Sequence, residues 1–185
     1  MAENQKKIAD WLLQESKQPR YTYKWSSNLN NNSLYYWVTD TNAPNILTTQ
    51  TLTLACFELP LCAAAIMGIF SKENIKDIYN RKFKENKSWH NILNGNKIFS
   101  PSQFNWQNET FEIPYGSIVS FNEDEHIAIA VGRDDLSKEN KIVNLWGEEK
   151  KGTSYMGVDS IKTIAFLLSN NGKRNVVVRY SDTIW

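Results

Sequence analysis

The chain has 185 residues, a formal net charge of +1, 41% apolar residues and 12% aromatic residues. This length accommodates one domain with a substantial core, and the aromatic content argues against disorder, so we expect a single domain over residues 1–185. The balanced charge gives no reason to expect a nucleic acid or an anionic membrane surface as a partner.

The first segment, residues 4–17, carries Ile8, Trp11 and Leu12 at helical spacing and is followed by Pro19, which predicts an amphipathic helix. It lacks the apolar core of a secretory signal peptide. The longest nearly uncharged apolar run, residues 59–70, is too short to span a bilayer. We therefore expect no membrane span and synthesis in the cytoplasm without a cleavable signal. Delivery outside the cell would require a specialised secretion route.

The next part of the chain reads as short extended segments followed by helices. Aromatic extended segments are expected at 21–25 and 33–39, on either side of an Asn-rich turn, and residues 40–53 are expected to be a loop. Apolar residues at i, i+3, i+4 and i+7 within 59–70 predict the main buried helix, which begins near residue 56.

Two further helices and a loop are expected after this buried helix. Ser71 is a good cap for a helix over 72–82, and residues 86–94 predict another short helix. The polar and aromatic segment 96–112 is expected to be a loop.

After Pro114 the apolar period changes to that of strands. Segments 116–121, 126–132 and 141–147 predict an antiparallel meander, and 175–180 predicts a last strand. Asp159 or Ser160 is a candidate cap for a helix that runs to residue 168, although a strand is also compatible with that segment. Helices that precede a meander, without parallel βαβ units, indicate an α+β fold.

The two cysteines of the chain, Cys56 and Cys62, differ in their expected position. On one helix they lie ~9 Å apart along the axis, which is too far for a disulfide. Pro60 is tolerated only near the first turn of a helix, so Cys56 is expected at the helix start and Cys62 in the apolar interior. Backbone N–H groups at a helix start favour a thiolate and can stabilise an oxyanion. Cys56 is therefore a candidate nucleophile, with an ordinary buried thiol as the alternative, and Cys62 is expected to be a packing residue.

His126 is the candidate general base for this thiol. It opens an apolar strand after an acidic turn, and imidazole is the usual partner of a nucleophilic thiol. If 126–132 and 141–147 form a hairpin, His126 lies opposite Trp146, and Asn144 lies on the same face two residues along. Asn144 would then orient the imidazole and Trp146 would shield the pair from water. The alternatives are a half-exposed His126 and a solvent-facing Asn144, and His90 is expected on a helix surface.

Metal and cofactor chemistry are not expected. The chain has two cysteines and two histidines without the spacing of a metal site, so we expect no metal ion and no organic cofactor.

The stretch around Cys56 together with "GSIVSF", "HIAIAVG" and "IVNLW" resembles the papain-like NlpC-type cysteine peptidases and amidases. More narrowly, "ACFELPLCAAAIMG" is similar to a Cys-Phe-Glu variant found in bacterial toxin and effector domains. The resemblance covers roughly residues 50–147. It implies a nucleophile helix packed on an antiparallel meander, with Cys56 as nucleophile, His126 as general base and Asn144 as the orienting residue.

The chain departs from the usual pattern of that family at several positions. Phe57 follows the cysteine where a small residue is usual, Ser117 replaces the aspartate of the "GD" strand, and the third residue is often histidine. We therefore expect a distinct substrate pocket to which Phe57, Glu58 and Trp146 contribute. The main expected role of Glu58 is negative charge in the first helical turn.

The sequence thus predicts a cysteine hydrolase that cleaves an amide bond in a peptide, protein or peptidoglycan-like substrate. Such a protein would act as a bacterial toxin or effector, with an immunity or target protein as its partner. One alternative keeps the fold but makes the enzyme a glutamine deamidase or an acyltransferase. A second alternative is a non-enzymatic binding module, in which the aromatic stretch 21–37 and Trp185 line a carbohydrate or partner surface.

Overall fold

The computed structural model describes residues 2–94, 102–148, 153–183 and 185, and it mixes helices with strands. The helices are α1 (Ala2–Lys17), α2 (Ser33–Thr39), α3 (Glu58–Ile66), α4 (Lys72–Glu85), α5 (Trp89–Leu93) and α6 (Ile161–Leu168), with a 3₁₀ turn η1 (Leu29–Asn31) before α2. The strands are β1 (Thr22–Trp25), β2 (Thr51–Leu54), β3 (Ser102–Phe104), β4 (Ile118–Phe121), β5 (His126–Arg133), β6 (Asn140–Glu148), β7 (Thr153–Ser160) and β8 (Val178–Ser181). The expected α+β class is confirmed.

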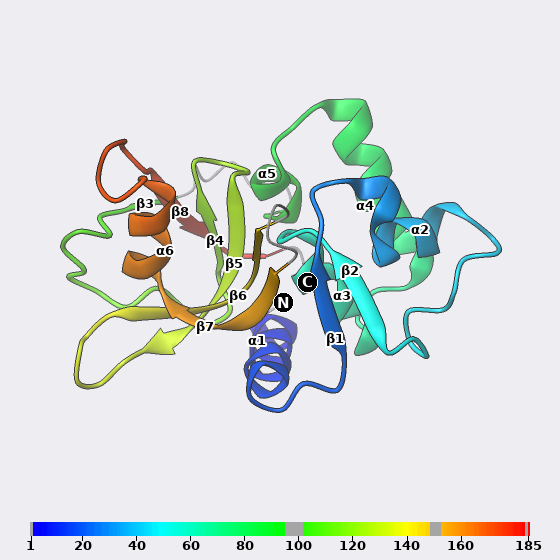
Figure 1. Cartoon of the computed structure of the whole chain (residues 1–185), viewed down its shortest axis with the longest axis horizontal. Helices are drawn as coiled ribbons and strands as arrows, with labels where there is room; N and C mark the ends of the chain where they lie inside the picture. The colour runs from blue at the N-terminus through cyan, green and yellow to red at the C-terminus, as the bar shows by residue number, and fades with distance from the viewer. Residues whose placement is uncertain (1, 95–101, 149–152, 184) are drawn as a thin grey trace.

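Most strands belong to one antiparallel sheet in the order β3-β8-β4-β5-β6-β7. Strands β4 to β7 follow chain order, so the expected meander is present and is extended by β7. Strands β1 and β2 pair in parallel as a separate small sheet. Figure 1 shows the large sheet and α6 in one half of the molecule, and β1, β2, α2 and α4 in the other half.

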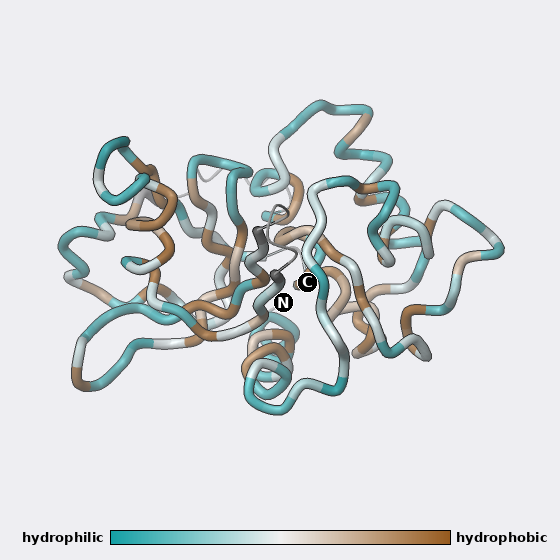
Figure 2. The backbone as a smooth tube through the Cα atoms, viewed as in Figure 1, coloured by the Kyte–Doolittle hydropathy of each residue, from teal (hydrophilic) through white to brown (hydrophobic). Residues whose placement is uncertain are grey.

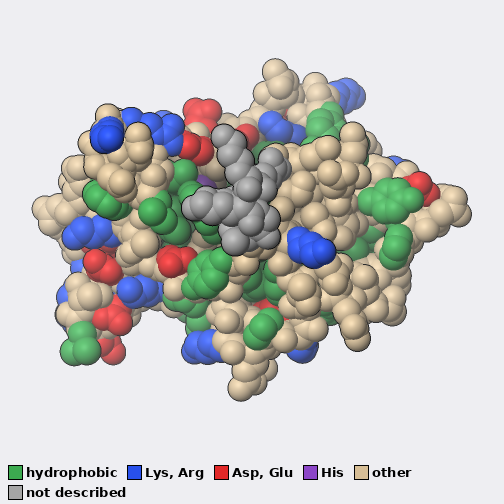
Figure 3. All heavy atoms as spheres, viewed as in Figure 1, with side chains coloured by type: hydrophobic (Ala, Val, Ile, Leu, Met, Phe, Trp, Pro, Cys, Tyr) green, Lys and Arg blue, Asp and Glu red, His purple; other side chains and the backbone are tan. Residues whose placement is uncertain are grey.

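The large sheet is apolar on both faces, and each face belongs to a different core. Ile127, Ile129 and Val143 pack in the core that also contains α1 and α3, whereas Ala128 and Ile142 pack in the core beneath α6. Figure 2 shows the hydrophobic segments gathered in the sheet and α6, with hydrophilic loops at both ends of the molecule. In Figure 3, charged side chains of both signs intermingle on the visible face.

Residues 33–39 form helix α2, so the expectation of an extended segment was wrong. Leu34 and Val38 are the buried residues of this helix, and their four-residue spacing places them on one helical face. The high content of aromatic and β-branched residues indicated a strand, but burial follows the helical period.

The expected loop over 40–53 was also wrong at its end, because residues 51–54 form β2. Leu52 and Leu54 are fully buried, and the strand pairs with β1. Within the expected loop 96–112, residues 102–104 form β3, whereas 96–101 lie outside the described residues. The buried helix ends at Ile66 rather than near residue 70, and Gly68 follows with a positive φ of 69°.

Two helix starts match the sequence-based expectation in detail. Ser71 caps α4 with a reciprocal capping box to Asn74. Ser160 caps α6 through a 3.1 Å hydrogen bond from the Thr163 N–H group to its Oγ atom. Over the described part of the chain, no helix combines the length and apolar character that a membrane crossing needs.

Candidate active site

Cys56 lies in a two-residue turn between β2 and α3. The Glu58 N–H group donates a 3.0 Å hydrogen bond to the Ala55 carbonyl, so Cys56 and Phe57 occupy the centre of the turn. Helix α3 begins at Glu58, two residues later than expected, and Pro60 falls in its first turn, where a proline is tolerated. The turn therefore presents the Cys56 thiol at the start of α3.

The Cys56 thiol lies against the start of β5. Burial raises the pKa of the thiol to about 11, and the charge of Asp124 adds to this rise, whereas the backbone N–H groups of Ile127 and Phe57 act in the opposite direction. Only 8% of the residue is exposed. The sequence-based expectation was that the helix start favours the thiolate. The N–H groups do lower the pKa of Cys56, but the net shift of the pKa is upward. At neutral pH the Cys56 side chain is therefore a neutral thiol. The N–H group that acts on it belongs to Ile127, the residue after His126.

His126 is held by Asn144 on the neighbouring strand. The Nε2 atom of His126 lies 3.1 Å from the Oδ1 atom of Asn144, and both residues are buried. The register that pairs Ile129 with Val143, continued for three residues, brings His126 opposite Trp146 as the sequence predicted. The structure therefore brings together the two residues expected to be the base and its orienting partner.

The hydrogen bonds of Asn144 determine the tautomer of His126. The Nδ2 atom of Asn144 donates to the Asp159 Oδ2 atom at 2.9 Å and to the Gly157 carbonyl at 3.4 Å. Because these acceptors need the amide NH₂ group, its oxygen faces the imidazole and accepts the Nε2–H group. The Nδ1 atom of the neutral ring then carries no proton and can act as the base. Burial lowers the pKa of His126 to about 4, although Asn144 and Glu125 act in the opposite direction.

Trp146 packs against this imidazole. The two ring centroids lie 5.0 Å apart in an edge-to-face arrangement. Trp146, Trp25, Gly147, Glu125 and His126 line a cavity of about 70 Å³. The Glu125 carboxylate accepts hydrogen bonds from Asn122 and Arg174, so its charge is already paired. The cavity next to the imidazole is therefore lined by two tryptophan side chains and by a carboxylate that is already paired with Arg174.

Phe57 packs inside the protein and has little surface for a substrate. Its ring stacks on Trp89 with centroids 3.8 Å apart and an interplanar angle of 12°, and 8% of the residue is exposed. The Trp89 and His90 N–H groups donate to the Asp124 carboxylate at 2.8 Å and 3.2 Å. Asp124 precedes His126 by two residues, so this stack connects the cysteine turn with the histidine turn.

The other predicted side chains are placed as follows. Glu58 has no exposed surface, and its carboxylate points to donors inside the protein, so it does not face a substrate. Cys62 is 2% exposed in the interior of α3, and burial raises its pKa. His90 is also 2% exposed and contacts the Ser181 hydroxyl, so the expectation of a surface histidine was wrong. Trp185 is buried in the core and not on a binding surface.

Several residues near the site were not singled out from the sequence. The sequence indicates Asp159 only as a helix cap and Asp124 only as part of an acidic turn. Trp89 carried no local signal for its contact with Phe57, because the two residues are far apart in the chain. Both cysteines are free, and among the described residues no cluster of three or more His, Cys, Asp or Glu side chains could hold a metal ion.

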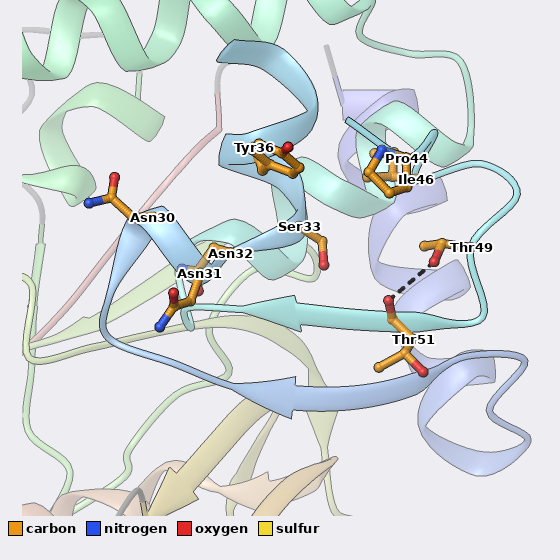
Figure 4. A pocket seen from close by; sticks show the side chains of 9 residues that line it. All are labelled: Asn30, Asn31, Asn32, Ser33, Tyr36, Pro44, Ile46, Thr49 and Thr51. Atoms are coloured by element: carbon orange, nitrogen blue, oxygen red, sulfur yellow. Dashed lines mark hydrogen bonds between the residues drawn. The ribbon is translucent and has the colours of Figure 1, made fainter. Parts of the chain in front are cut away.

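Another cavity, of about 230 Å³, lies between α2 and the segment that leads into β2 (Figure 4). Its lining is mostly uncharged and polar: Asn30, Asn31, Asn32, Ser33, Tyr36, Pro44, Ile46, Thr49 and Thr51. The Thr49 hydroxyl donates to the Thr51 carbonyl at 3.5 Å. None of the predicted catalytic residues lines this cavity.

Comparison of this chain with family models, with curated proteins and with solved structures gives no match in any of the three.

Proposed function

We propose that this protein is a cysteine hydrolase of papain-like fold that cleaves an amide bond in a peptide, protein or peptidoglycan-like substrate. The observation that carries the proposal is the His126–Asn144 pair, because the N–H group of Ile127, the residue after His126, acts on the Cys56 thiol. A thiol nucleophile is activated by a neighbouring imidazole that a third group orients, and the His126–Asn144 pair supplies the imidazole and the orienting group of such a site.

In the proposed reaction, the Cys56 sulfur attacks the amide carbonyl carbon while its proton moves to the Nδ1 atom of His126. The thiol and the imidazole are both neutral at rest, as their shifted pKa values indicate, so the proton moves during the attack. Asn144 then stabilises the imidazolium through the Nε2–H group. Backbone N–H groups around the thiol, including that of Cys56, stabilise the negative oxygen of the tetrahedral intermediate.

Collapse of that intermediate breaks the carbon–nitrogen bond. His126 returns its proton to the leaving amine, and the acyl group remains on Cys56 as a thioester. Water then attacks the thioester with His126 as its base, which releases the carboxylic acid and restores the thiol. No other group has to enter the reaction.

The test compares Cys56→Ala with Cys62→Ala. We would incubate each variant with labelled casein, with purified peptidoglycan and with glutamine peptides, and measure chain cleavage and ammonia. The proposal requires cleavage that is lost in Cys56→Ala and kept in Cys62→Ala. Ammonia release without cleavage would instead indicate a deamidase on the same residues. Activity that persists in Cys56→Ala would contradict both reactions.

A further inference from the structure

Glu58 is a fully buried carboxylate that the proposed reaction does not use. It lies at the first position of α3, two residues after Cys56, with no exposed surface. A buried carboxylate is unfavourable unless hydrogen bonds satisfy it. The partners of Glu58 therefore indicate what the residue does.

One oxygen of Glu58 closes the turn that contains the cysteine. The Ala55 N–H group donates to the Oε2 atom at 2.7 Å, and the Glu58 N–H group donates back to the Ala55 carbonyl at 3.0 Å. This reciprocal pair spans Cys56 and Phe57. It has the form of the acidic half of a capping box, and Ala55 has no side-chain oxygen that could close the turn instead.

The same carboxylate connects this turn to two other elements. The Nδ2 atom of Asn32, the residue before α2, donates to Oε2 at 2.6 Å, and the hydroxyl of Tyr79 on α4 donates to Oε1. Both partners are buried, at 0% and 1% exposure. The Cys56 turn is thereby fixed to α2 and α4, which Figure 1 shows in the same half of the molecule.

We propose that Glu58 is a positioning residue that holds the Cys56 turn in the geometry needed for attack, an inference that rests on the proposed function. It acts through the Ala55 N–H group and not by contact with substrate. A glutamine can keep this geometry, because its oxygen accepts from Ala55 and Asn32 while its NH₂ group donates to the Tyr79 oxygen. A leucine of similar size cannot make any of these bonds.

Glu15 provides a matched control because it is also a fully buried glutamate. Its carboxylate accepts from the Arg20 and Tyr21 N–H groups and from the Arg20 side chain, at the end of α1. Loss of Glu15 should lower stability without loosening the Cys56 turn.

The experiment uses the full chain with Cys62→Ala, so that Cys56 is the single thiol. In this background we would make Glu58→Gln, Glu58→Leu, Glu15→Gln and Glu15→Leu. For each variant we would measure the rate of Cys56 alkylation by iodoacetamide, kcat and KM on the cleaved substrate, and the melting temperature. The alkylation rate needs no known substrate and therefore tests Glu58 separately from the proposed function.

We expect Glu58→Gln to retain the parental rates within about threefold and Glu58→Leu to lose about tenfold or more in alkylation and kcat, with little change in KM. Glu15→Leu should melt earlier but keep the Cys56 rates. A folded Glu58→Leu protein with parental alkylation would overturn the proposal. So would an equal loss in Glu15→Leu, because the effect would then follow stability alone.

Asn32→Ala keeps the proposal testable if Glu58→Leu does not fold. It removes one donor from the same oxygen, so we expect a loss of about threefold in the alkylation rate. Tyr79→Phe leaves the Oε2 bonds intact and should change the rate less than Asn32→Ala. Parental alkylation in Asn32→Ala would contradict the proposal. If Cys56→Ala keeps its hydrolytic activity, the proposed function fails, while the alkylation rates still report on the turn.

Discussion

The Oδ1 atom of Asn144 accepts the Nε2–H group of His126 across strands β5 and β6, at a distance of 3.1 Å. The Asn144 amide cannot rotate without cost, because its NH₂ group is bound by Asp159 and Gly157. A flipped amide would place an N–H donor against the Nε2–H group of His126. The second strand of the hairpin thus sets both the orientation and the tautomer of the imidazole.

We expect Asn144→Ala to lower kcat by about 10²-fold, because the imidazole loses its orientation and the imidazolium loses a buried acceptor. KM should change little, since Asn144 does not face a substrate. Steady-state kinetics together with circular dichroism would check this expectation. Asp159→Asn is the control, because it retains an oxygen that accepts the Asn144 NH₂ group. An Asn144→Ala protein with parental kcat would remove Asn144 from the mechanism.

The elements that the sequence predicted well are those with local signals. Ser71 and Ser160 each place a hydroxyl three residues before an N–H group of the first helical turn, so the two helix starts could be read directly. The hairpin of β5 and β6 was indicated by two short apolar runs separated by a polar segment, and its register brought His126 and Asn144 together. Pro60 placed the start of the buried helix to within two residues, because a proline is tolerated only near the first helical turn.

The features that could not be predicted depend on contacts between distant segments. Strand β7 has a partly polar sequence and is stabilised by pairing along β6. The role of Glu58 depends on donors 26 and 21 residues away, Asn32 and Tyr79. The raised pKa of Cys56 reflects tertiary burial, which a helix start does not reveal. The sequence therefore indicated that backbone N–H groups lower the pKa of Cys56, but not that burial raises it by more.

The reactivity of Cys56 toward iodoacetamide should depend on pH in two phases. The pKa of the thiol is raised to about 11 by burial, so the thiolate phase should rise through the alkaline range. Base-assisted attack through neutral His126, whose pKa is lowered to about 4, should add a lower plateau from mildly acidic pH upward. His126→Ala should abolish the plateau and keep the alkaline rise. Mass spectrometry of alkylated protein in the Cys62→Ala background would measure these rates. A plateau that persists in His126→Ala would show that His126 does not act as the base.

The buried His90 should contribute to acid sensitivity. Burial lowers its pKa from 6.5 to about 4, so the unfolded chain binds more protons than the folded protein between these values. Its contribution is present above pH 6.5 and is lost as the pH falls toward 4. His90→Leu removes this titration and should reduce the acid-dependent loss of unfolding free energy by on the order of 2 kcal/mol. Urea titrations at pH 7 and pH 4.5 measure the difference, and an equal loss in parent and variant would exclude His90 as a source.

Asp124 influences the thiol in two ways, which two substitutions separate. Its carboxylate accepts the Trp89 and His90 N–H groups, and its charge raises the pKa of Cys56. Asp124→Asn keeps an acceptor oxygen but removes the charge, so the alkaline rise in Cys56 alkylation should shift to lower pH. Asp124→Ala also removes the acceptor, which should cost about 1 kcal/mol of stability and loosen the stack of Trp89 on Phe57.

The two measurements for the Asp124 variants are the alkylation rate against pH and the free energy of unfolding in urea. Asp124→Asn should shift the first with a small change in the second, whereas Asp124→Ala should change both. The salt bridge from Lys82 to Asp124, at 3.8 Å, is lost in each variant and therefore does not distinguish them. An unshifted profile in Asp124→Asn would show that the charge does not act on the thiol. The Cys56 turn and the Asp124 turn would then remain connected through Trp89. Its N–H group bonds to Asp124, and its ring stacks on Phe57.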